Sequence, residues 1–379
     1  MCKLLLTKDR SIVRHASRAL LVLFGANWAS PASTAPSMSS VTREYSSYTA
    51  TDPDCTNMKD TASIAYHTAT GKVYISTDLG CIAEVDPNNL NIIRSKDLNQ
   101  GKAHQLASDG SFIYVHTVYD RVNRRQKVLK IDPSATTGLN AIKQATIFNA
   151  TGSPEGFVFL GSYLYIAVGG YDSASGRLPG KIVKLSKSNL TVQATWIMPT
   201  IENSPNHENH GLTTDGTYLY ALTVPQRSQM RDRYYKLNQS LVLQDSHQFS
   251  ANGSLGGNVY LGGKIYTSGG KLWKLDPSTL AEEASQGCGV HWLARDATYI
   301  YRLGTKLTGS SCTTKSDGDI GYIEVVNPST MSVLLSYRSN PAWPHLHYGI
   351  VANGYLWVAY EAQGTPLANG RIARYRFNP

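Results

Sequence analysis

The chain has 379 residues, of which 41% are hydrophobic and 17% are charged, so it can bury a large core and fits neither a disordered nor a membrane-embedded protein. Its 32 glycines and 23 tyrosines, and the lack of helix-forming runs after residue 40, indicate an all-β protein. The formal net charge is +9, but no basic run resembles a nucleic-acid-binding stripe, and we expect no nucleic-acid partner.

The first 32 residues have the features of a secretory signal. Five basic side chains lie in or before a short apolar stretch at residues 19–26, and small residues follow it. The apolar stretch is too short to span a bilayer, so we expect a cleaved signal and a secreted, extracellular protein rather than a membrane anchor. The alternatives are a disordered basic tail and an organelle presequence. Cleavage after Ala32 lowers the formal net charge from +9 to +5.

The cysteines that remain after cleavage are even in number: Cys55, Cys81, Cys288 and Cys312. An oxidising compartment then favours two disulfides, and the shortest loops pair Cys55 with Cys81 and Cys288 with Cys312. No CxxC spacing indicates a cysteine-based zinc site. Sequons at Asn149, Asn189, Asn238 and Asn252 are compatible with a glycoprotein.

A repeated hairpin is the strongest pattern in the chain. It consists of an alternating apolar strand, a tight turn and a second strand, as in CIAEVDPNNLNII, VLKIDPSATTGL, IVKLSKSNLTVQ, YYKLNQSLVLQ, LWKLDPSTLAEE and YIEVVNPSTMSVL. A second hairpin with inward aromatic residues precedes each of these. Two hairpins per unit form a four-stranded sheet, and the units start near residues 61, 101, 153, 207, 255, 290 and 346.

The repeats predict a seven-bladed β-propeller with four-stranded antiparallel blades over residues 61–379, after a signal at 1–32 and an N-terminal segment at 33–60. The last unit lacks an outer strand before the chain ends. Residues 43–51 could supply it, which would pair the free sheet edge and close the ring. The hairpin pattern resembles the quinoprotein-like and YVTN-type group of propellers over about residues 43–379. This resemblance implies a fold but not a function.

A set of histidines shares one position in the repeat. Counting ten residues back from the aromatic residue of each second strand reaches His104, Glu155, His210, His291 and His347, but Ile64 and Gly256 in the first and fifth units. A shorter turn in the last unit would place Tyr348 there instead of His347. Because innermost strands border the channel, such a ring could act as a general base or hold a divalent metal. The alternative is a structural role in blade geometry.

Long loops are expected on the same face as the ring, and they carry tyrosines and arginines. Tyr119 and Tyr171 could stack on sugars or donate a proton, and Arg227 and Arg231 could bind a carboxylate in bidentate fashion. For any single arginine, a solvated surface position is an equally good explanation.

His, Tyr and Arg around a propeller mouth resemble secreted propeller lyases that act on rhamnose-glucuronate and other uronic-acid polysaccharides. The resemblance implies His104 or His210 as the base, Tyr119 or Tyr171 as the acid, and Arg227 or Arg231 as the carboxylate clamp. Glu155, His291, His347 and Tyr348 would complete the substrate-binding site. We therefore expect a monomeric enzyme that cleaves an acidic polysaccharide or oligosaccharide by β-elimination, with no cofactor required beyond a metal that the ring could ligate.

The competing hypothesis is a lectin or adhesion propeller that binds glycan or protein without catalysis. A lectin tends to repeat its ligand residues at the outer rim of most blades, whereas an enzyme gathers unlike residues in one axial pocket. The unlike residues of the ring and the uneven loops favour the enzyme. No GxSxG, HExxH, P-loop or dinucleotide-binding motif indicates another chemistry.

Overall fold

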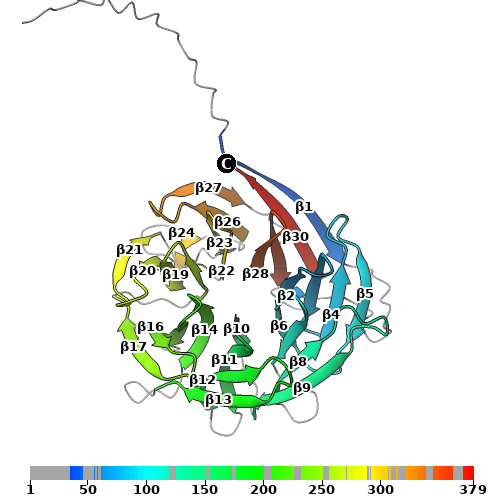
Figure 1. Ribbon diagram of the computed structural model, residues 1–379. Helices are drawn as coiled ribbons and strands as arrows, with labels where there is room; N and C mark the ends of the chain where they lie inside the picture. The colour runs from blue at the N-terminus through cyan, green and yellow to red at the C-terminus, as the bar shows by residue number, and fades with distance from the viewer. Residues whose placement is uncertain are drawn as a thin grey trace, which may run out of the picture. The chain divides into compact units, whose positions relative to one another are not determined.

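The described residues form a ring of seven four-stranded antiparallel sheets, or blades (Figure 1). The computed structural model describes residues 35–45, 55, 58, 61–118, 125–149, 154–172, 176–199, 207–225, 232–250, 256–269, 271–287, 290, 292–305, 307–308, 313–314, 321–338, 345–361 and 370–379. The blades belong to a compact unit, Pro36–Pro379. This confirms the predicted all-β, seven-bladed propeller. No helix that could cross a bilayer occurs in these ranges.

Each of the first six blades runs from its inner to its outer strand in chain order. Blade 1 consists of β2 (Thr61–His67), β3 (Lys72–Thr77), β4 (Cys81–Val85) and β5 (Ile92–Asp97). Blade 2 consists of β6 (Ala103–Ser108), β7 (Ile113–Thr117), β8 (Gln126–Ile131) and β9 (Ala141–Phe148). Blade 3 consists of β10 (Pro154–Leu160), β11 (Tyr163–Asp172), β12 (Gly176–Ser186) and β13 (Val192–Ile197).

The next three blades repeat this order. Blade 4 consists of β14 (His207–Thr214), β15 (Leu219–Pro225), β16 (Arg233–Leu237) and β17 (Leu243–Gln248). Blade 5 consists of β18 (Asn258–Leu261), β19 (Lys264–Gly269), β20 (Lys271–Leu275) and β21 (Glu282–Gln286). Blade 6 consists of β22 (Trp292–Arg295), β23 (Ile300–Thr305), β26 (Gly321–Val326) and β27 (Val333–Arg338), and a short ribbon of β24 (Leu307–Thr308) and β25 (Thr313–Thr314) lies between β23 and β26 in the chain.

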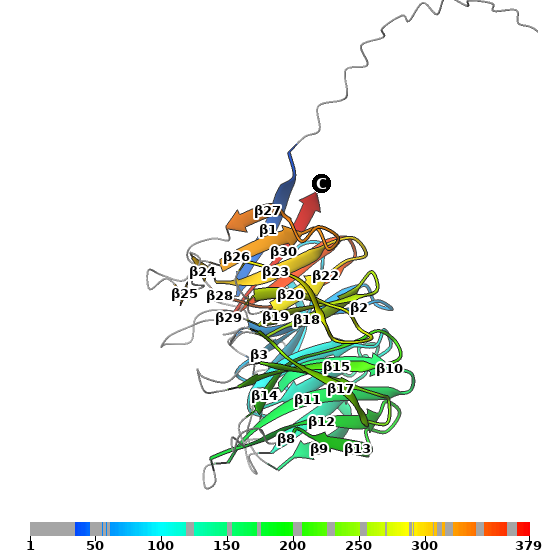
Figure 2. The same cartoon turned by 90° about the vertical axis from the view of Figure 1, so that its left-hand side faces the viewer.

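Blade 7 combines strands from both ends of the chain. It contains β28 (His345–Ala352), β29 (Tyr355–Glu361) and β30 (Gly370–Asn378), and its outer strand is β1 (Ser37–Tyr45). β1 runs antiparallel to β30, from the Ser37 and Asn378 pair to the Tyr45 and Gly370 pair, and the two strands lie side by side in both views (Figure 2). An N-terminal strand therefore closes the ring, as the sequence predicted.

The closing strand begins earlier than predicted. The sequence suggested residues 43–51, whereas β1 begins at Ser37, and only residues 43–45 of the suggested range lie in the described strand. Near its start, Met38 and Phe377 pack against the apolar cluster shared by blades 6 and 7, which fixes the register. Residues 46–51 lie outside the described residues.

The hydrophobic core is divided into layers between neighbouring blades. The junction of blades 2 and 3, for example, packs Tyr114 and Val128 against Leu164, Ile166 and Val183. Comparable clusters fill the other junctions around the ring. Because each fully buried Leu, Ile or Val contributes about 1.5–3 kcal/mol, the junctions hold the ring together.

Tyrosines of the second strands also connect blades 2, 3, 4 and 5 to the blade that follows each of them. The hydroxyl of Tyr165 in blade 3 donates to the carbonyl of Gln239 in blade 4 at 2.7 Å, and Tyr266 in blade 5 donates to the carbonyl of Pro328 in blade 6 at 2.8 Å. Burial raises the pKa of Tyr165 to about 12, so this hydroxyl stays protonated and able to donate. At blade 1, Arg94 of the outer strand makes the corresponding connection and donates to the carbonyl of Ala135 in blade 2 at 2.6 Å.

The outer hairpins share an unusual backbone conformation. An apolar residue adopts a positive φ close to 60° after the turn in five blades: Leu90, Leu190, Leu241, Leu280 and Met331. This region costs a branched or long side chain roughly 1–2 kcal/mol. All five side chains are buried between blades, and their burial offsets the cost.

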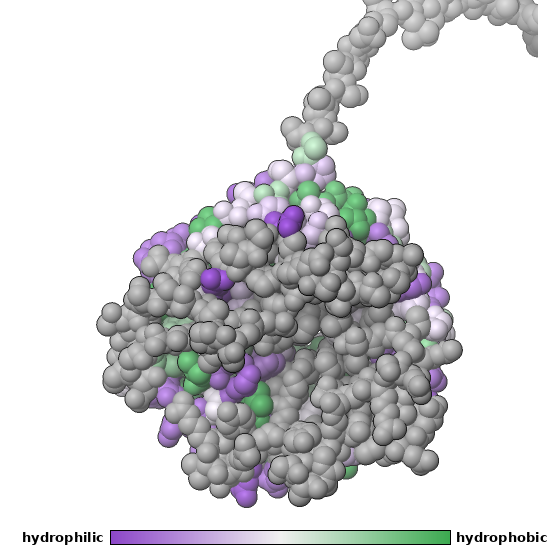
Figure 3. Space-filling view, turned by 180° about the vertical axis from the view of Figure 1, so that it is seen from behind, coloured by the Kyte–Doolittle hydropathy of each residue, from purple (hydrophilic) through white to green (hydrophobic). Residues whose placement is uncertain are grey.

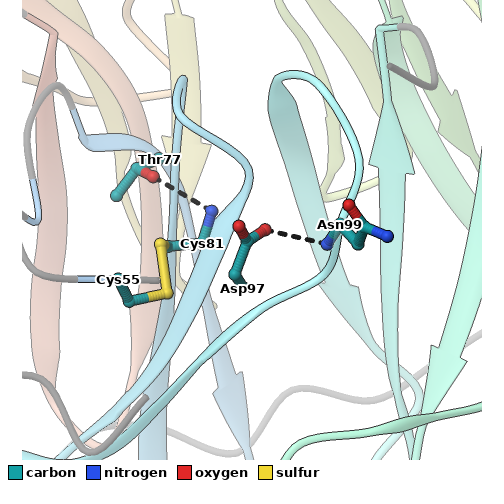
Figure 4. The surroundings of a disulfide bond; sticks show 5 residues. All are labelled: Cys55, Thr77, Cys81, Asp97 and Asn99. Carbon is teal, nitrogen blue, oxygen red and sulfur yellow. Dashed lines mark hydrogen bonds between the residues drawn. A yellow bond between two sulfur atoms is a disulfide. The ribbon is translucent and has the colours of Figure 1, made fainter. Parts of the chain in front are cut away.

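A disulfide fastens the segment between the closing strand and blade 1. Cys55 is bonded to Cys81, the first residue of β4, with a Cα–Cα distance of 5.9 Å (Figure 4). On the same segment, the carbonyl of Met58 accepts a hydrogen bond from the amide of Gly370 at 2.6 Å. The predicted pairing of Cys55 with Cys81 is confirmed, whereas Cys288 and Cys312 lie outside the described residues.

We expect the double substitution Cys55→Ala and Cys81→Ala to destabilise the fold by about 3 kcal/mol. The disulfide joins residues 26 apart, and a loop of that size restricts the unfolded chain by this order of free energy. Chemical denaturation of the variant and the parent protein measures the difference. Peptide mass analysis without reductant provides the control, and free thiols at both positions in the parent would contradict the disulfide.

Candidate functional site

The predicted ring position coincides with a break in the pairing of the inner strands. Where β6 pairs with β7, the register moves from Ala103 directly to Gln105 and leaves out His104. The same β-bulge leaves out Glu155 in β10, His210 in β14 and His347 in β28. A bulge bends a strand and re-aims the side chain of its extra residue, and bulges are frequent next to active sites.

The strand register corrects the ring position in blade 1 and identifies the ring residue of blade 7. Blade 1 pairs Ala65 with Tyr74, whereas blade 2 pairs Ala107 with Tyr114, so the first hairpin of blade 1 is two residues longer. The bulge of blade 1 is therefore at Ala62 and not at Ile64, which the count from the aromatic residue had reached. In blade 7, His347 occupies the bulge.

The other two blades reach the ring position before their inner strands begin. β18 starts at Asn258, two residues after Gly256, and β22 starts at Trp292, immediately after His291. His291 lies outside the described residues. The side chains of Glu155, His210 and His347 also lie outside the described part, so the structure places these three by backbone alone.

The ring position lies at the face from which the loops between second and third strands leave. Ala103 at the start of β6 is paired with Thr117 at the end of β7, and Asn209 with Thr223 in blade 4. In blade 3 the β11–β12 hairpin continues beyond the start of β10, where Tyr171 pairs with Arg177. The Tyr171 side chain and all of Tyr119, Arg227 and Arg231 lie outside the described residues.

Three aromatic rings from three blades meet at the level of the ring position. The imidazole of His104 in blade 2 contacts the edge of Tyr348 in blade 7, with centroids 5.8 Å apart. Tyr348 in turn packs against Trp292 of blade 6, with centroids 4.5 Å apart. The indole N–H of Trp292 donates to the carbonyl of Gly349 at 2.9 Å. Because blades 2 and 7 are not neighbours, this contact spans the inner edge of blade 1.

His104 is held in place and largely covered by this packing. Only 8% of its surface is exposed, and Tyr348 is buried as well. Its ring is therefore oriented before any ligand arrives, which favours a positioned acid or base over a freely rotating surface histidine.

A second histidine lies behind His104 in the interior of blade 2. His116 is paired with Gln105, the residue after His104, and its Nε2 lies 3.1 Å from the amide oxygen of Gln126. The amide nitrogen of Gln126 donates to the carbonyl of Gly169 in blade 3 at 2.8 Å. Complete burial lowers the pKa of His116 to about 3, so its ring is neutral at ordinary pH and places no positive charge behind His104.

The inner strands also line a cavity of about 380 Å³ in the channel, and Trp292 belongs both to its wall and to the group of three aromatic rings. Its described lining includes residues from all seven inner strands or the turns that follow them. Trp292 and Phe157 form aromatic walls, and Ile64, Leu106 and Ile350 contribute aliphatic ones. Gln105 and Asn258 are the amides of the lining. The cavity extends to Ser108, the last residue of β6, and so toward the face opposite the loops.

Glycines next to the ring position let neighbouring inner strands approach each other. Gly156 follows Glu155, and a Cβ added to it would lie 2.8 Å from the backbone nitrogen of Leu212 in blade 4. Gly211 follows His210, and an added Cβ would lie 3.0 Å from the side-chain oxygen of Asn258. The pattern of a ring residue followed by glycine thus has a steric cause.

Within the described residues, neither a metal-binding cluster nor the outer surface indicates a further site. Among the described residues, no group of three or more His, Cys, Asp or Glu side chains could hold a metal ion. Exposed apolar side chains such as Ile93 and Ile142 lie on outer strands, which is ordinary for a protein surface. The coloured surface in Figure 3 accordingly mixes hydrophilic and hydrophobic residues.

No protein-family model matches the chain, and no curated protein matches its sequence. The sequence analysis did not single out Trp292, Gln105 or His116. Trp292 and Gln105 directly follow the ring residues His291 and His104, and this adjacency was the available signal. His116 gave none, because its role depends on burial.

We expect the stability of the protein to fall as the pH falls from about 6.5 toward 3, with His116 as one cause. The unfolded chain protonates this ring below its ordinary pKa of 6.5, whereas the folded chain resists protonation down to about 3. The parent should therefore lose about 1.4 kcal/mol more per pH unit than His116→Gln in this range. Denaturant unfolding at pH 6.5 and 4.5 measures both slopes, and equal slopes would contradict the assignment.

We expect Gly156→Ala to destabilise the ring by about 1–3 kcal/mol, because its new methyl group would overlap a backbone atom that cannot move alone. Gly211→Ala is the matched control and should cost less, because the added Cβ comes no closer than 3.0 Å to the Asn258 side chain and 3.4 Å to its backbone nitrogen. Thermal unfolding of the two variants measures the difference. A larger loss in Gly211→Ala would show that the inner strands are spaced differently.

Proposed function

We propose that this protein is a secreted carbohydrate-active enzyme that cleaves a uronic-acid-containing glycan by β-elimination at the loop face of its channel. One observation carries the proposal: four inner strands place His104, Glu155, His210 and His347 at β-bulges of the same level. Three imidazoles and a carboxylate at equivalent places on different blades suit a site that acts on one axial ligand. A lectin would repeat one residue type around the rim.

The reaction needs a base, an acid and a group that neutralises the uronate carboxylate. A neutral imidazole, His104 or His210, removes the C5 proton, and the electron pair left behind forms the C4–C5 double bond as the C4–O bond breaks. A tyrosine hydroxyl, Tyr119 or Tyr171, donates a proton to the departing oxygen. Arg227 or Arg231 pairs with the carboxylate and makes the C5 proton more acidic.

Features of the described residues support these roles for His104 and Tyr171. Tyr348 fixes the imidazole of His104, and His116 behind it is neutral. The β11–β12 hairpin carries Tyr171 past the start of the inner strand, on the face where a substrate would approach. Acidic glycan also suits the positive net charge that the chain retains without its first 32 residues.

We expect the purified protein to raise the ultraviolet absorbance of at least one polysaccharide in a panel of uronate-containing substrates, because β-elimination leaves an unsaturated uronate. His104→Ala or His210→Ala should lower the rate by about 100-fold or more, as for a removed general base. His247→Ala is the matched control, since His247 lies on the outer strand β17, where its Nε2 is 3.0 Å from Oε1 of Glu282.

The assay also separates the two classes of function. If the absorbance rises equally fast in the parent and in all variants, the ring histidines are not part of the mechanism. No rise on any substrate, with glycan binding retained in the parent and all variants, would overturn the lyase and favour a glycan-binding propeller.

A further inference from the structure

We propose that the channel cavity beyond His104 and Tyr348 is a binding site for a small neutral aromatic molecule that carries an O–H or N–H donor, such as a phenol or an indole. This inference does not rest on the proposed lyase activity. It concerns the part of the channel that is lined by residues following the ring position in the inner strands, and it depends only on described residues.

The size and walls of the cavity suit one or two aromatic rings. Its volume is about 380 Å³, and a dry apolar cavity of about 150 Å³ is already large enough to bind benzene. Phe157 and Trp292 offer aromatic surfaces on which a ring can pack face to face or edge to face. Leu106, Leu212 and Ile350 supply further apolar contact.

The charge and polarity of the lining exclude other ligand classes. The described lining residues carry no Asp, Glu, Lys, Arg or His side chain, so they offer nothing to neutralise an ion. A sugar would need partners for several hydroxyl groups, whereas the polar lining consists of two amides and the hydroxyls of Tyr66, Thr68 and Ser108. An aromatic ring with one or two hydrogen-bond donors needs fewer polar partners from the lining.

A buried acceptor oxygen points to the donor on the ligand. The side-chain oxygen of Gln105 has no hydrogen-bond partner, although Gln105 is only 4% exposed. The side-chain oxygen of Asn258 also lacks a partner, but it lies against Gly211 of blade 4. The Asn258 amide nitrogen donates to the carbonyl of Tyr220 at 3.3 Å and to the hydroxyl of Tyr234 at 3.1 Å, so this amide is held toward blade 4 and Gln105 is the acceptor that we assign to the ligand.

A buried acceptor without a partner costs free energy, and a ligand that donates to it recovers that cost. Since Gln105 lines the cavity, a rotation of its side chain would bring the oxygen within reach of an O–H or N–H group while the ring of the ligand occupies the apolar part. Entry does not require passage through the loop face, because the lining reaches Ser108 and Ala352 at the ends of their strands.

Isothermal titration calorimetry of the purified protein with phenol and with benzene tests the site. We expect one saturable site that binds phenol about fivefold more tightly than benzene, as one net hydrogen bond predicts. Gln105→Leu should abolish this preference while keeping the binding of benzene. Gln144→Leu, on the exposed outer strand β9 of the same blade, is the matched control and should leave both affinities unchanged.

A second variant keeps the test decisive if Gln105→Leu does not fold. Ala107→Leu adds volume at a half-buried lining position and should weaken both ligands by at least tenfold. The proposal is overturned if neither ring binds saturably to the parent protein. It is also overturned if binding survives Ala107→Leu unchanged, because the ligand then occupies some other place.

Discussion

The pairing of β1 with β30 holds the last blade against the first, and the geometry of the channel follows from that closure. Gly370 begins β30 and donates to Met58, and the amide of Arg371 donates to the hydroxyl of Thr61 at 2.7 Å. These contacts set β2 of blade 1 beside blade 7, where Trp357 and Ile372 share an apolar cluster with Ile64 and Val73. Without closure, blades 2 and 7 would have no fixed relation, and the contact between His104 and Tyr348 depends on that relation.

The channel is divided along its length by the same inner strands that form its wall. At the start of these strands, bulges take one residue out of the ladder in blades 1, 2, 3, 4 and 7, and the following glycines in blades 3 and 4 let the strands approach closely. Further along the strands the pairing is regular and the lining is mostly apolar. Each of these inner strands thus has an irregular end that carries the ring position and a regular end that lines the channel mostly with apolar residues.

The repeat was predictable because its determinants are local. Turn residues such as those in DPNNL and DPSTL, and the alternation of apolar residues, gave the blades and their order. The position equivalent to His104 was found in blades 3, 4 and 7 because their first hairpins have nearly the same length. The count reached Ile64 instead of Ala62 in blade 1 because the first hairpin of this blade has two extra residues, and only the strand register reveals them.

Other features depend on contacts between residues far apart in the sequence. The start of the closing strand was predicted six residues too late, since Ser37 is placed by its pairing with Asn378 near the end of the chain. The neutrality of His116 follows from complete burial, and the packing of Tyr348 on both His104 and Trp292 requires three blades to be assembled. Pattern and spacing carry no information of this kind.

The partnership of β1 and β30 has a consequence for synthesis. Of all strands in the ring, β1 is made first and its partner is made last, so β1 waits on the ribosome without a neighbour while the blades between them are translated. A waiting strand that was rich in apolar residues would invite pairing with other nascent chains. The sequence of β1, SMSSVTREY, is instead mostly hydroxyl-bearing and charged, and it keeps only Met38 and Val41 as aliphatic side chains. This composition therefore lowers the risk that the unpaired strand associates with other chains before β30 is made.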